Sequence, residues 1–393
     1  MLIRKKSLKK ARRLRKNNMK VMTVFGTRPE AIKMAPLVKA LKADPYFETI
    51  VCVTAQHREM LDQVLELFDI KPDYDLNVMK KGQTLSMITS DVIEGLDKVL
   101  EEAKPDIVLV HGDTTTSFAA ALASFYHQVS VGHVEAGLRT FDKYSPYPEE
   151  MNRQMTGRLA DLHFSPTVRN KENLINENIS EDKIYITGNT VIDALLWAAD
   201  SRYEFEGELA DILDKKSRVI TVTCHRRENL GEYMKNIFTA LADIAKEYKD
   251  VDVVYPVHLN PTVRDAANKY LGGLSNVHLI EPLTYQPFTK LLKASYIVVT
   301  DSGGIQEEAP ALGKPVLVVR KETERPEAVE AGTVKLSGVE RKQIYEDIKM
   351  LLDSKEAYDK MANAVNPYGD GKASQRIVED LKEFDKKQKN KIK

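Results

Sequence analysis

At 393 residues the chain is too long for one hydrophobic core and fits two domains of ordinary size. Charged residues make up 30% of it and hydrophobic residues 42%, and no apolar run approaches the roughly 20 residues that cross a bilayer, so we expect a soluble protein without a membrane span. Nine basic residues and no acidic one precede Met19, which leaves a body with a net charge of −9 and argues against nucleic acid as the main partner.

The basic leader, residues 1–18, lacks the apolar segment of a signal peptide. We interpret it as a disordered tail or as the product of an upstream start codon, with Met19 opening the folded protein. Binding of anionic surfaces by the tail is the alternative interpretation. Cys52 and Cys224 each lie in an apolar, strand-like run, where a reduced, buried thiol is commoner than a disulfide. The cysteines therefore favour a cytoplasmic protein.

Short β-branched runs alternate with helical patterns, which is typical of parallel sheets built from strand–helix–strand units. The first half contains predicted strands at 20–25, 49–54, 106–110, 129–133, 162–165 and 183–187. The second half contains them at 219–223, 251–257, 277–280, 296–300 and 316–319. We therefore predict an α/β protein with two doubly wound, Rossmann-like domains, 19–188 and 189–369, whose joint lies between 188 and 216. A C-terminal helix within 370–393 is expected to pack back on the first domain.

The first strand ends at Gly26, and Arg28 and Pro29 follow at a predicted helix start. Proline suits the first helical position, where no amide hydrogen is needed. In open parallel sheets ligands bind beyond the carboxyl ends of the strands, and a helix N-terminus with Arg28 and Lys33 nearby suits an anion. The alternative, an exposed arginine and lysine on a surface helix, is the commoner fate of these residues.

Three carboxylates follow in the same half. Asp113 and Glu135 each come just after a predicted strand, although Asp113 could instead be a helix N-cap worth about 1 kcal/mol. Glu149 enters a helix four residues before Arg153, with which it could form an ordinary surface pair. We predict that the three carboxylates share one site. Such a group suits proton abstraction and return, because burial and like-charge repulsion can raise one pKa while another carboxyl group stays ionised.

The second half offers groups that suit a phosphate. The segment 225–227, His-Arg-Arg, follows a predicted strand and places positive charge at its end. The segment 301–304, Asp-Ser-Gly-Gly, opens a helix, where backbone amides can surround a phosphate. Glu308 lies one turn further on, in reach of a ribose diol. An ordinary turn is an equally good interpretation of Ser-Gly-Gly alone.

Several familiar motifs are missing from the sequence. No G-x-G-x-x-G follows a strand, which disfavours NAD, and no G-x-x-x-x-G-K-[ST] occurs, which disfavours a P-loop ATPase. Histidine, cysteine and acidic residues do not fall at a recognisable metal-ligand spacing. We therefore expect neither a cofactor nor a metal.

Together these segments resemble the non-hydrolysing UDP-N-acetylglucosamine 2-epimerases, from Met19 to about Arg376. The motifs that carry the resemblance, in the family's order, are GTRPEAIK at 26–33, HGDT at 111–114, HVEAGLR at 133–139, PEEMNR at 148–153, HRREN at 225–229 and DSGGIQEEAP at 301–310. The resemblance implies the glycosyltransferase-B type of fold, with two Rossmann-like domains and the active site in the cleft between them. It also implies a homodimer.

The family inverts C2 of UDP-GlcNAc to give UDP-ManNAc without an added redox cofactor, by eliminating UDP to leave 2-acetamidoglucal and adding it back. Carried over by position, the implied UDP-binding residues are Arg28, His225, Phe288, Ser302, Gly303, Gly304 and Glu308. Among these, Phe288 would line the uracil pocket and Glu308 would bind the ribose. The implied catalytic residues are the acid/base candidates Asp113, Glu135 and Glu149, with Lys33, Arg153 and His225 supporting the sugar or the leaving group. Which carboxylate acts on which face of C2 stays open.

Two positions depart from the family pattern. Cys224 stands where many relatives have a small residue, which we expect to alter only packing. Bacterial members bind a second UDP-GlcNAc as an activator beside a Gln-His-Arg stretch, here Gln56, His57 and Arg58, and beside an arginine whose place is taken by Gly82. Activation is therefore expected to be weaker or different.

The main alternatives are a UDP-sugar glycosyltransferase or a hydrolysing 2-epimerase on the same fold. A transferase needs an acceptor groove, for which the sequence shows no dedicated segment. A protein that only binds a UDP-sugar as a regulator is an alternative of another class. All the candidate acids are present, which argues against that alternative.

Overall fold

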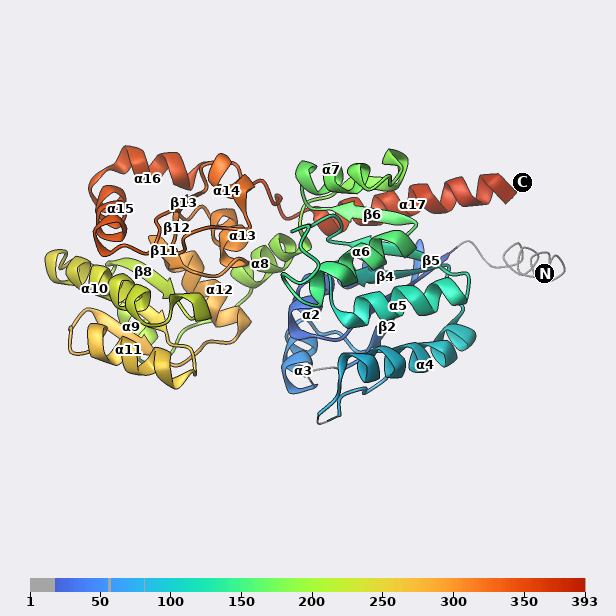
Figure 1. The fold of residues 1–393 in the computed structure, drawn as a ribbon, viewed down its shortest axis with the longest axis horizontal. Helices are drawn as coiled ribbons and strands as arrows, with labels where there is room; N and C mark the ends of the chain where they lie inside the picture. Colours follow the sequence, from blue (N-terminus) through green and yellow to red (C-terminus); the bar gives the residue numbers. More distant parts are fainter. Residues whose placement is uncertain (1–17, 56–57, 81, 393) are drawn as a thin grey trace. The chain divides into compact units, whose positions relative to one another are not determined.

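The computed structural model describes residues 18–55, 58–80 and 82–392, and the chain forms two compact units. Unit 1 takes the chain up to Ala194 and again from Gly371, and unit 2 is Leu195–Asp370. The division falls within α8 (Thr190–Asp200), drawn in yellow-green in Figure 1. The basic leader up to residue 17 lies outside the described residues.

The described part of unit 1 contains a parallel sheet of seven strands in the order β3-β2-β1-β4-β5-β6-β7. Its strands are β1 (Met19–Phe25), β2 (Phe47–Val53), β3 (Tyr74–Asp75), β4 (Ile107–His111), β5 (Ser130–Val134), β6 (Leu162–Ser165) and β7 (Ile184–Ile186). All six predicted strands are present within one or two residues. The sequence missed β3, which is only two residues long and carries no apolar alternation. Winding reverses at β1, so the topological switch point lies between β1 and β4.

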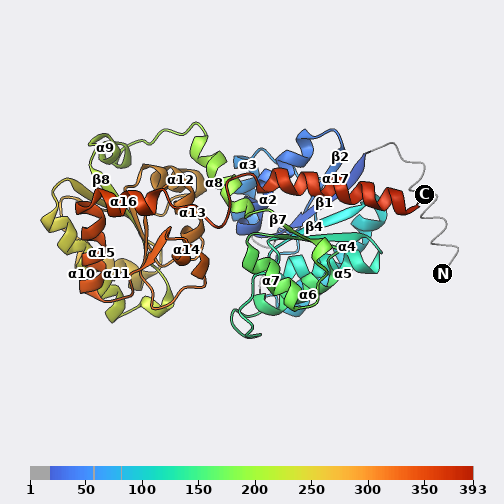
Figure 2. The ribbon, with the colours of Figure 1, turned by 90° about the horizontal axis from the view of Figure 1, so that it is seen from above.

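Helices cover both faces of this sheet. They are α2 (Arg28–Ala43), α3 (Arg58–Leu67), α4 (Leu85–Ala103), α5 (Thr115–Tyr126), α6 (Glu149–Leu159), α7 (Val168–Asn176), the 3-10 turn η1 (Glu181–Lys183) and α17 (Ala373–Ile392). Figure 2 shows α2 and α17 on one face of the sheet and α4 and α5 on the other. Alternate residues of β1 and β4, such as Met22 and Val108, pack against α4 and α5 in one apolar cluster.

The last helix, α17, packs within unit 1 beside α2. Tyr46 donates its hydroxyl hydrogen to Asp385 over 2.6 Å, and Lys382 lies 2.7 Å from Asp44. At the start of α17 the carboxylate of Asp193 accepts the backbone amides of residues 373 and 374, at 3.1 and 2.8 Å. These bonds satisfy helix N-terminal donors that have no partner within the helix.

Unit 2 contains a parallel sheet of six strands in the order β10-β9-β8-β11-β12-β13. Its strands are β8 (Arg218–Thr223), β9 (Val251–Pro256), β10 (Val277–Ile280), β11 (Ile297–Thr300), β12 (Val316–Val318) and β13 (Val334–Leu336). The five predicted strands are present, and the short edge strand β13 was missed. The switch point lies between β8 and β11. The prediction of two doubly wound, Rossmann-like sheets in one α/β chain is confirmed.

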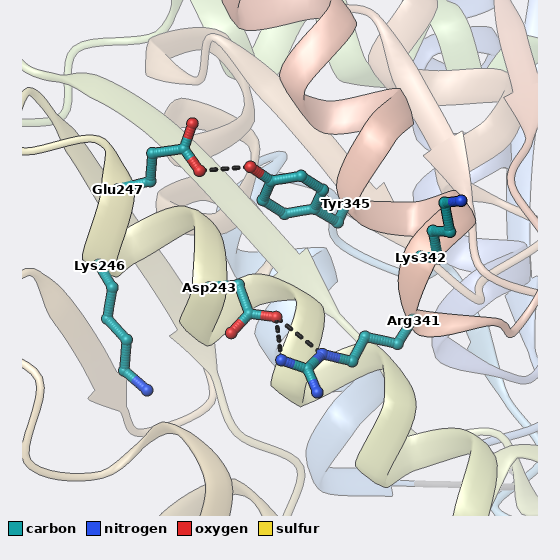
Figure 3. Close-up of a pocket in the computed structure, with 6 residues that line it drawn as sticks. All are labelled: Asp243, Lys246, Glu247, Arg341, Lys342 and Tyr345. Carbon is teal, nitrogen blue, oxygen red and sulfur yellow. Dashed lines mark hydrogen bonds and ion pairs between the residues drawn. The ribbon is translucent and has the colours of Figure 1, made fainter.

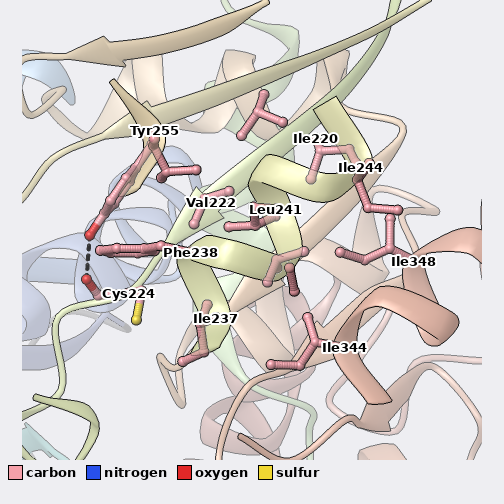
Figure 4. Packing of buried hydrophobic residues seen from close by; sticks show 14 of the residues in the cluster. Ile220, Val222, Cys224, Ile237, Phe238, Leu241, Ile244, Tyr255, Ile344 and Ile348 are labelled. Carbon is pink, nitrogen blue, oxygen red and sulfur yellow. Dashed lines mark hydrogen bonds between the residues drawn. The ribbon is translucent and has the colours of Figure 1, made fainter. Parts of the chain in front are cut away.

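The helices of unit 2 are α9 (Glu208–Asp214), η2 (Arg227–Asn229), α10 (Glu232–Glu247), α11 (Pro261–Leu271), α12 (Tyr285–Ala294), α13 (Ile305–Ala311), α14 (Pro326–Glu330), α15 (Arg341–Asp353) and α16 (Lys355–Ala362). Figure 4 shows the main core, where Val222 of β8 meets Phe238 and Leu241 of α10 and Ile344 of α15. Cys224 lies at the edge of this core, and the Tyr255 hydroxyl donates to its carbonyl oxygen. The core therefore fixes the end of β8, where the predicted cationic segment begins.

Candidate active site

The predicted site residues of unit 1 follow β1, β4 and β5 or lie in α6. After β1, Thr27 caps α2 and Glu30 completes a capping box. The Glu30 carboxylate is 2% exposed and accepts the amides of Gly26 and Thr27 at 3.1 and 2.7 Å with one oxygen. Its other oxygen accepts the hydroxyls of Thr114 and Ser117, at 2.6 and 3.1 Å, at the start of α5. One buried carboxylate thus ties the turn that carries Arg28 to the turn that carries Asp113.

Gly26 is required at the tip of β1 because neighbouring side chains fill the space beside it. A Cβ atom there would lie 1.9 Å from the hydroxyl of Thr54 and 3.0 Å from that of Thr116. Any larger residue would push the turn out of place.

Glu135 lies at the end of β5 and binds two cationic or potentially cationic side chains. Its Oε2 lies 2.5 Å from Lys33 Nζ and 3.0 Å from His111 Nε2. Burial alone raises the pKa of Glu135, but the neighbouring Lys33 and His111 outweigh it and bring the pKa below its usual range. Glu135, whose side chain is 13% exposed, is therefore an ionised carboxylate at neutral pH. Its backbone has φ +62°, a left-handed conformation that costs about 1–3 kcal/mol and clusters at functional sites.

Asp113 follows β4, and its pKa is shifted in the opposite direction to that of Glu135. Burial raises its pKa, Arg153 opposes the rise, and the charge of Glu135 adds to it. Arg153 Nη2 lies 3.1 Å from the carboxylate, and Asn152 donates to the Asp113 carbonyl oxygen over 3.0 Å. The cap of α5 is Thr114, so Asp113 is free of the structural role that the sequence left open. Two neighbouring carboxyl groups with pKa values moved apart are suited to a proton donor and a proton acceptor.

The alternative interpretation of Glu149 and Arg153 as a surface ion pair is not borne out. Arg153 donates only to the backbone carbonyl of Glu149, and its charged partners are Asp113 at 3.1 Å and Glu150 at 3.6 Å. The tertiary fold brings the tip of β4 to α6, which offers Arg153 the carboxylate of Asp113. Glu149 is still close enough for its charge to raise the pKa of Asp113. All three predicted carboxylates are therefore neighbours in unit 1.

Arg28 is the first residue of α2 and is half-buried. Within the described part of the chain no carboxylate pairs with its guanidinium, in contrast to Lys33 one turn further on. A half-buried, uncompensated arginine at a helix N-terminus is a suitable group for an anion.

In unit 2 the switch point is organised by Asp301, directly after β11. Its side chain is 0% exposed, and its Oδ2 accepts the amides of His225 and Arg226 at 2.8 and 2.7 Å and the Asn229 side-chain amide at 3.1 Å. The tips of β8 and β11 are therefore tied together by one carboxylate, as in unit 1. The His225 ring stacks on His258 at 4.9 Å, and burial lowers the pKa of His225.

The Ser302–Gly304 turn lies under two arginines. A Cβ atom at Gly303 would lie 3.8 Å from Arg226 Nη2, 3.9 Å from Arg325 Nη2 and 3.8 Å from the carboxylate oxygen Oε2 of Glu324. Arg325 also pairs with the buried Glu307 of α13. The turn therefore combines small residues with two nearby guanidinium groups, which is a composition that suits phosphate oxygens.

Phe288 on α12 and Glu308 on α13 complete the predicted set in unit 2. Phe288 is half-buried and lies one turn from Tyr285. Burial and the nearby Glu308 carboxylate raise the pKa of Tyr285, so α12 and the Glu308 side chain are neighbours. His225 and the Ser302–Gly304 turn thus come just after β8 and β11, and Glu308 lies in the helix that follows this turn.

Several organising residues were missed by sequence reasoning. They are Glu30, Glu150 and Arg325, whereas His111, Arg226 and Asp301 were part of the motifs and only their contacts were unknown. For Glu30 a signal existed, because Thr27 and Glu30 have the spacing of a capping box. The others are recognisable only once strand ends are brought together. The predicted activator residues Gln56 and His57 lie outside the described residues, while Gly82 has φ +78°, a conformation that side chains other than glycine rarely adopt.

One cavity of unit 2 is lined mainly by charged side chains. This cavity of about 690 Å³ on the outside of unit 2 is lined by α10 and α15, and Figure 3 shows two pairs among its lining residues, Asp243 with Arg341 and Glu247 with Tyr345. Among the described side chains no group of three or more His, Cys, Asp or Glu could hold a metal ion. In the part of the chain that the structure describes, every helix is too short or too polar to cross a bilayer.

Comparisons with known proteins extend over almost the whole chain. The family model of UDP-N-acetylglucosamine 2-epimerase matches residues 39–382. The UDP-N-acetylglucosamine 2-epimerase of Bacillus subtilis is 60% identical over 365 residues, which are 92% of this chain and 95% of that protein.

Solved structures agree. A crystal structure from Listeria monocytogenes has a TM-score of 0.90 and 55% identity and covers 94% of this chain and 97% of its own. A UDP-GlcNAc 2-epimerase from Neisseria meningitidis, solved bound to UDP-GlcNAc, has a TM-score of 0.81 and 54% identity over 93% of this chain and 100% of its own. The resemblance seen in the sequence motifs is confirmed, and the chain belongs to the UDP-N-acetylglucosamine 2-epimerase family.

Proposed function

We propose that this protein catalyses the reversible C2 epimerisation of UDP-GlcNAc and UDP-ManNAc, through elimination and re-addition of UDP. The observation that carries the proposal is the pair of carboxyl groups at the tips of β4 and β5. The pKa of Asp113 is raised and that of Glu135 is lowered, which suits proton exchange at a carbon atom. Family membership supports the same reaction.

In the proposed reaction a carboxylate accepts the C2 proton, and the electron pair of the C2–H bond forms a double bond between C1 and C2. The C1–O bond breaks, and the electron pair of that bond leaves with UDP to give 2-acetamidoglucal. Addition then returns a proton to the opposite face of C2 while a UDP oxygen re-forms the bond to C1. Glu135 is ionised and ready to accept a proton, and Asp113 is biased towards the protonated state and ready to donate one. Glu149 is the third acid/base candidate, and Lys33 and Arg153 keep these carboxyl groups in place.

For the nucleotide we propose that Arg28, His225 and the Ser302–Gly304 turn bind the diphosphate. Glu308 is assigned to the ribose and Phe288 to the uracil. The cationic groups at the end of β8 support this assignment, since a departing diphosphate gains negative charge and is stabilised by pre-placed cations. The relative from Neisseria meningitidis was crystallised with UDP-GlcNAc, which supports the same ligand here.

Replacing Arg28 by alanine is expected to weaken UDP binding about tenfold or more, because a charge-assisted hydrogen bond to phosphate is worth about 1.5–3 kcal/mol. Isothermal titration with UDP measures the change. Lys42→Ala, at the exposed C-terminal end of the same helix, is the control and should leave the affinity unchanged. Equal UDP affinity in Arg28→Ala and the wild type would remove Arg28 from the site.

The function is tested by incubating the protein with UDP-GlcNAc alone in deuterated water. Formation of UDP-ManNAc, with deuterium at C2 of both sugars, is the expected result. Release of free ManNAc would identify a hydrolysing epimerase, and the absence of turnover would identify a transferase or a binding protein. Nuclear magnetic resonance distinguishes these products directly.

We further infer a cytoplasmic homodimer, on the strength of the family resemblance and of two cysteines that are both buried and free. Light scattering should give about twice the chain mass of 44.4 kDa. A mass equal to one chain across the working concentration range would contradict the dimer.

A further inference from the structure

The left-handed backbone conformation of Glu135 is not explained by the contacts of its own side chain. A non-glycine residue at φ +62° is under strain and persists only where its surroundings determine the conformation. If the segment relaxed to an ordinary conformation, the Cα–Cβ bond would turn and the carboxylate would leave Lys33 and His111. The groups that hold residues 135–139 in this conformation therefore also determine where the Glu135 carboxylate lies.

Helix α7 packs directly on this segment. Gly137 has φ +97°, and a Cβ atom there would lie 2.2 Å from the carbonyl oxygen of Asn170. Asn173 donates its side-chain amide to the Gly137 carbonyl oxygen over 3.0 Å. The amide of Ala136 is bonded to the end of β6 at Phe164, also at 3.0 Å. The segment is thus fixed by close packing in its middle.

The far end of the segment is fixed by an ion pair. Arg139 donates from Nε and Nη2 to the two carboxylate oxygens of Glu177, at 2.6 and 2.9 Å, directly after α7. The Arg139 side chain is 0% exposed, and its Nη1 closes the turn by donating to the Leu138 carbonyl oxygen at 2.7 Å. A bidentate ion pair of this kind fixes the relative orientation of the two side chains as well as the distance between them. Neither residue lies among the acid/base candidates.

We propose that the Arg139–Glu177 ion pair is a positioning pair, which holds the Glu135 carboxylate against Lys33 and His111 by locking residues 135–139 onto α7. The inference rests on the proposed function, since it assigns these residues to the turnover step of that reaction. The pair acts on the reacting carboxylate and not on the nucleotide. Its loss should therefore lower kcat and leave nucleotide binding in place.

Glu177→Gln tests the pair, because glutamine keeps the shape of the side chain and removes one acceptor and the charge. We expect kcat to fall about 10- to 100-fold, as misplacement of a catalytic group by about 1 Å does elsewhere, with KM and UDP affinity within about twofold. Glu181→Gln is the matched control, since it removes the ion pair of Lys171, at 2.6 Å, on the same helix α7 without touching residues 135–139. The control should keep the wild-type kcat.

Further variants separate positioning from general stability. Arg139→Lys keeps the positive charge but cannot donate two parallel hydrogen bonds to the Glu177 carboxylate. Its kcat should therefore lie between those of the wild type and Arg139→Gln. Arg139→Gln combined with Glu177→Gln should be no slower than the slower single variant, because both residues act through one interaction. Asn173→Ala removes the hydrogen bond to the Gly137 carbonyl oxygen and should lower kcat by a smaller factor. If Glu177→Gln does not fold, the kcat of Asn173→Ala tests the positioning role in its place.

The wild type is assayed first for C2 deuteration, so that a failure of the proposed function is recognised before the variants are judged. With an active wild type, normal kcat in both Glu177→Gln and Asn173→Ala would overturn the positioning role. Multiplying effects in the double variant would overturn it as well, and so would equal losses of kcat and UDP affinity.

Discussion

Replacing Glu135 by glutamine is expected to lower epimerisation about 10²- to 10⁴-fold while UDP affinity stays within about twofold. Glutamine has nearly the same shape but cannot take up a proton from carbon. It also leaves Lys33 and His111 without the carboxylate that they share at 2.5 and 3.0 Å. The nucleotide-binding groups assigned in unit 2 belong to other segments, around residues 225 and 302–308, which is why binding should survive. Turnover of UDP-GlcNAc and titration with UDP measure the two quantities separately.

Asp113→Asn and Glu149→Gln complete this comparison, and each should also cost orders of magnitude in rate. Glu101→Gln, on the exposed surface of α4, is the control carboxylate and should behave as the wild type. If Glu135→Gln and Glu149→Gln both kept near-normal turnover, the assignment of the carboxylates would be wrong.

Unit 1 is expected to lose stability between pH 6.5 and about pH 4 because two neutral histidines are buried in its sheet. Burial lowers the pKa of His133 to about 3 and that of His163 to about 4, from 6.5 in an unfolded chain. Above pH 6.5 both states are neutral, and below it only the unfolded state gains the proton. Each imidazole should therefore cost about 2 kcal/mol of unfolding free energy at pH 5.

His163→Phe isolates this effect. His163 is 0% exposed and, among the described residues, neither of its ring nitrogens has a hydrogen-bond partner, so phenylalanine sacrifices no bond. Urea denaturation followed by circular dichroism should show that the wild type loses about 2 kcal/mol more than the variant between pH 7.5 and pH 5. Asp380, whose pKa is raised to about 7, changes stability in the opposite direction but is common to both proteins. Parallel pH curves would contradict the buried-imidazole explanation.

The positions of the candidate residues could be predicted because strand ends are visible in a sequence. Short β-branched runs mark where each parallel strand stops, and parallel strands bring their carboxyl ends to one edge of a sheet. Asp113 and Glu135 were predicted to be neighbours on this basis, and the mutual effect of their charges bears it out. The edge strands β3 and β13 were missed because two or three residues carry no periodic signal.

The partners of those residues could not be predicted. Helical spacing allowed Glu149 as a partner of Arg153, which was the alternative interpretation, but the tip of β4 supplies Asp113 at 3.1 Å. Spacing along one helix measures distances only within that helix, whereas a buried guanidinium takes whichever carboxylate the fold brings to it. The same holds for Asp301, whose three hydrogen-bond donors lie more than 70 positions earlier in the chain.

The sequence by itself determined the two doubly wound sheets, the family and the kinds of chemical group at each strand end, because these depend on local periodicity and on contiguous motifs. Only the tertiary structure decided which carboxyl group is ionised and which is biased towards protonation. That difference comes from Lys33 and His111 around Glu135 and from burial around Asp113, and burial and charge at close range exist only after distant segments have packed together.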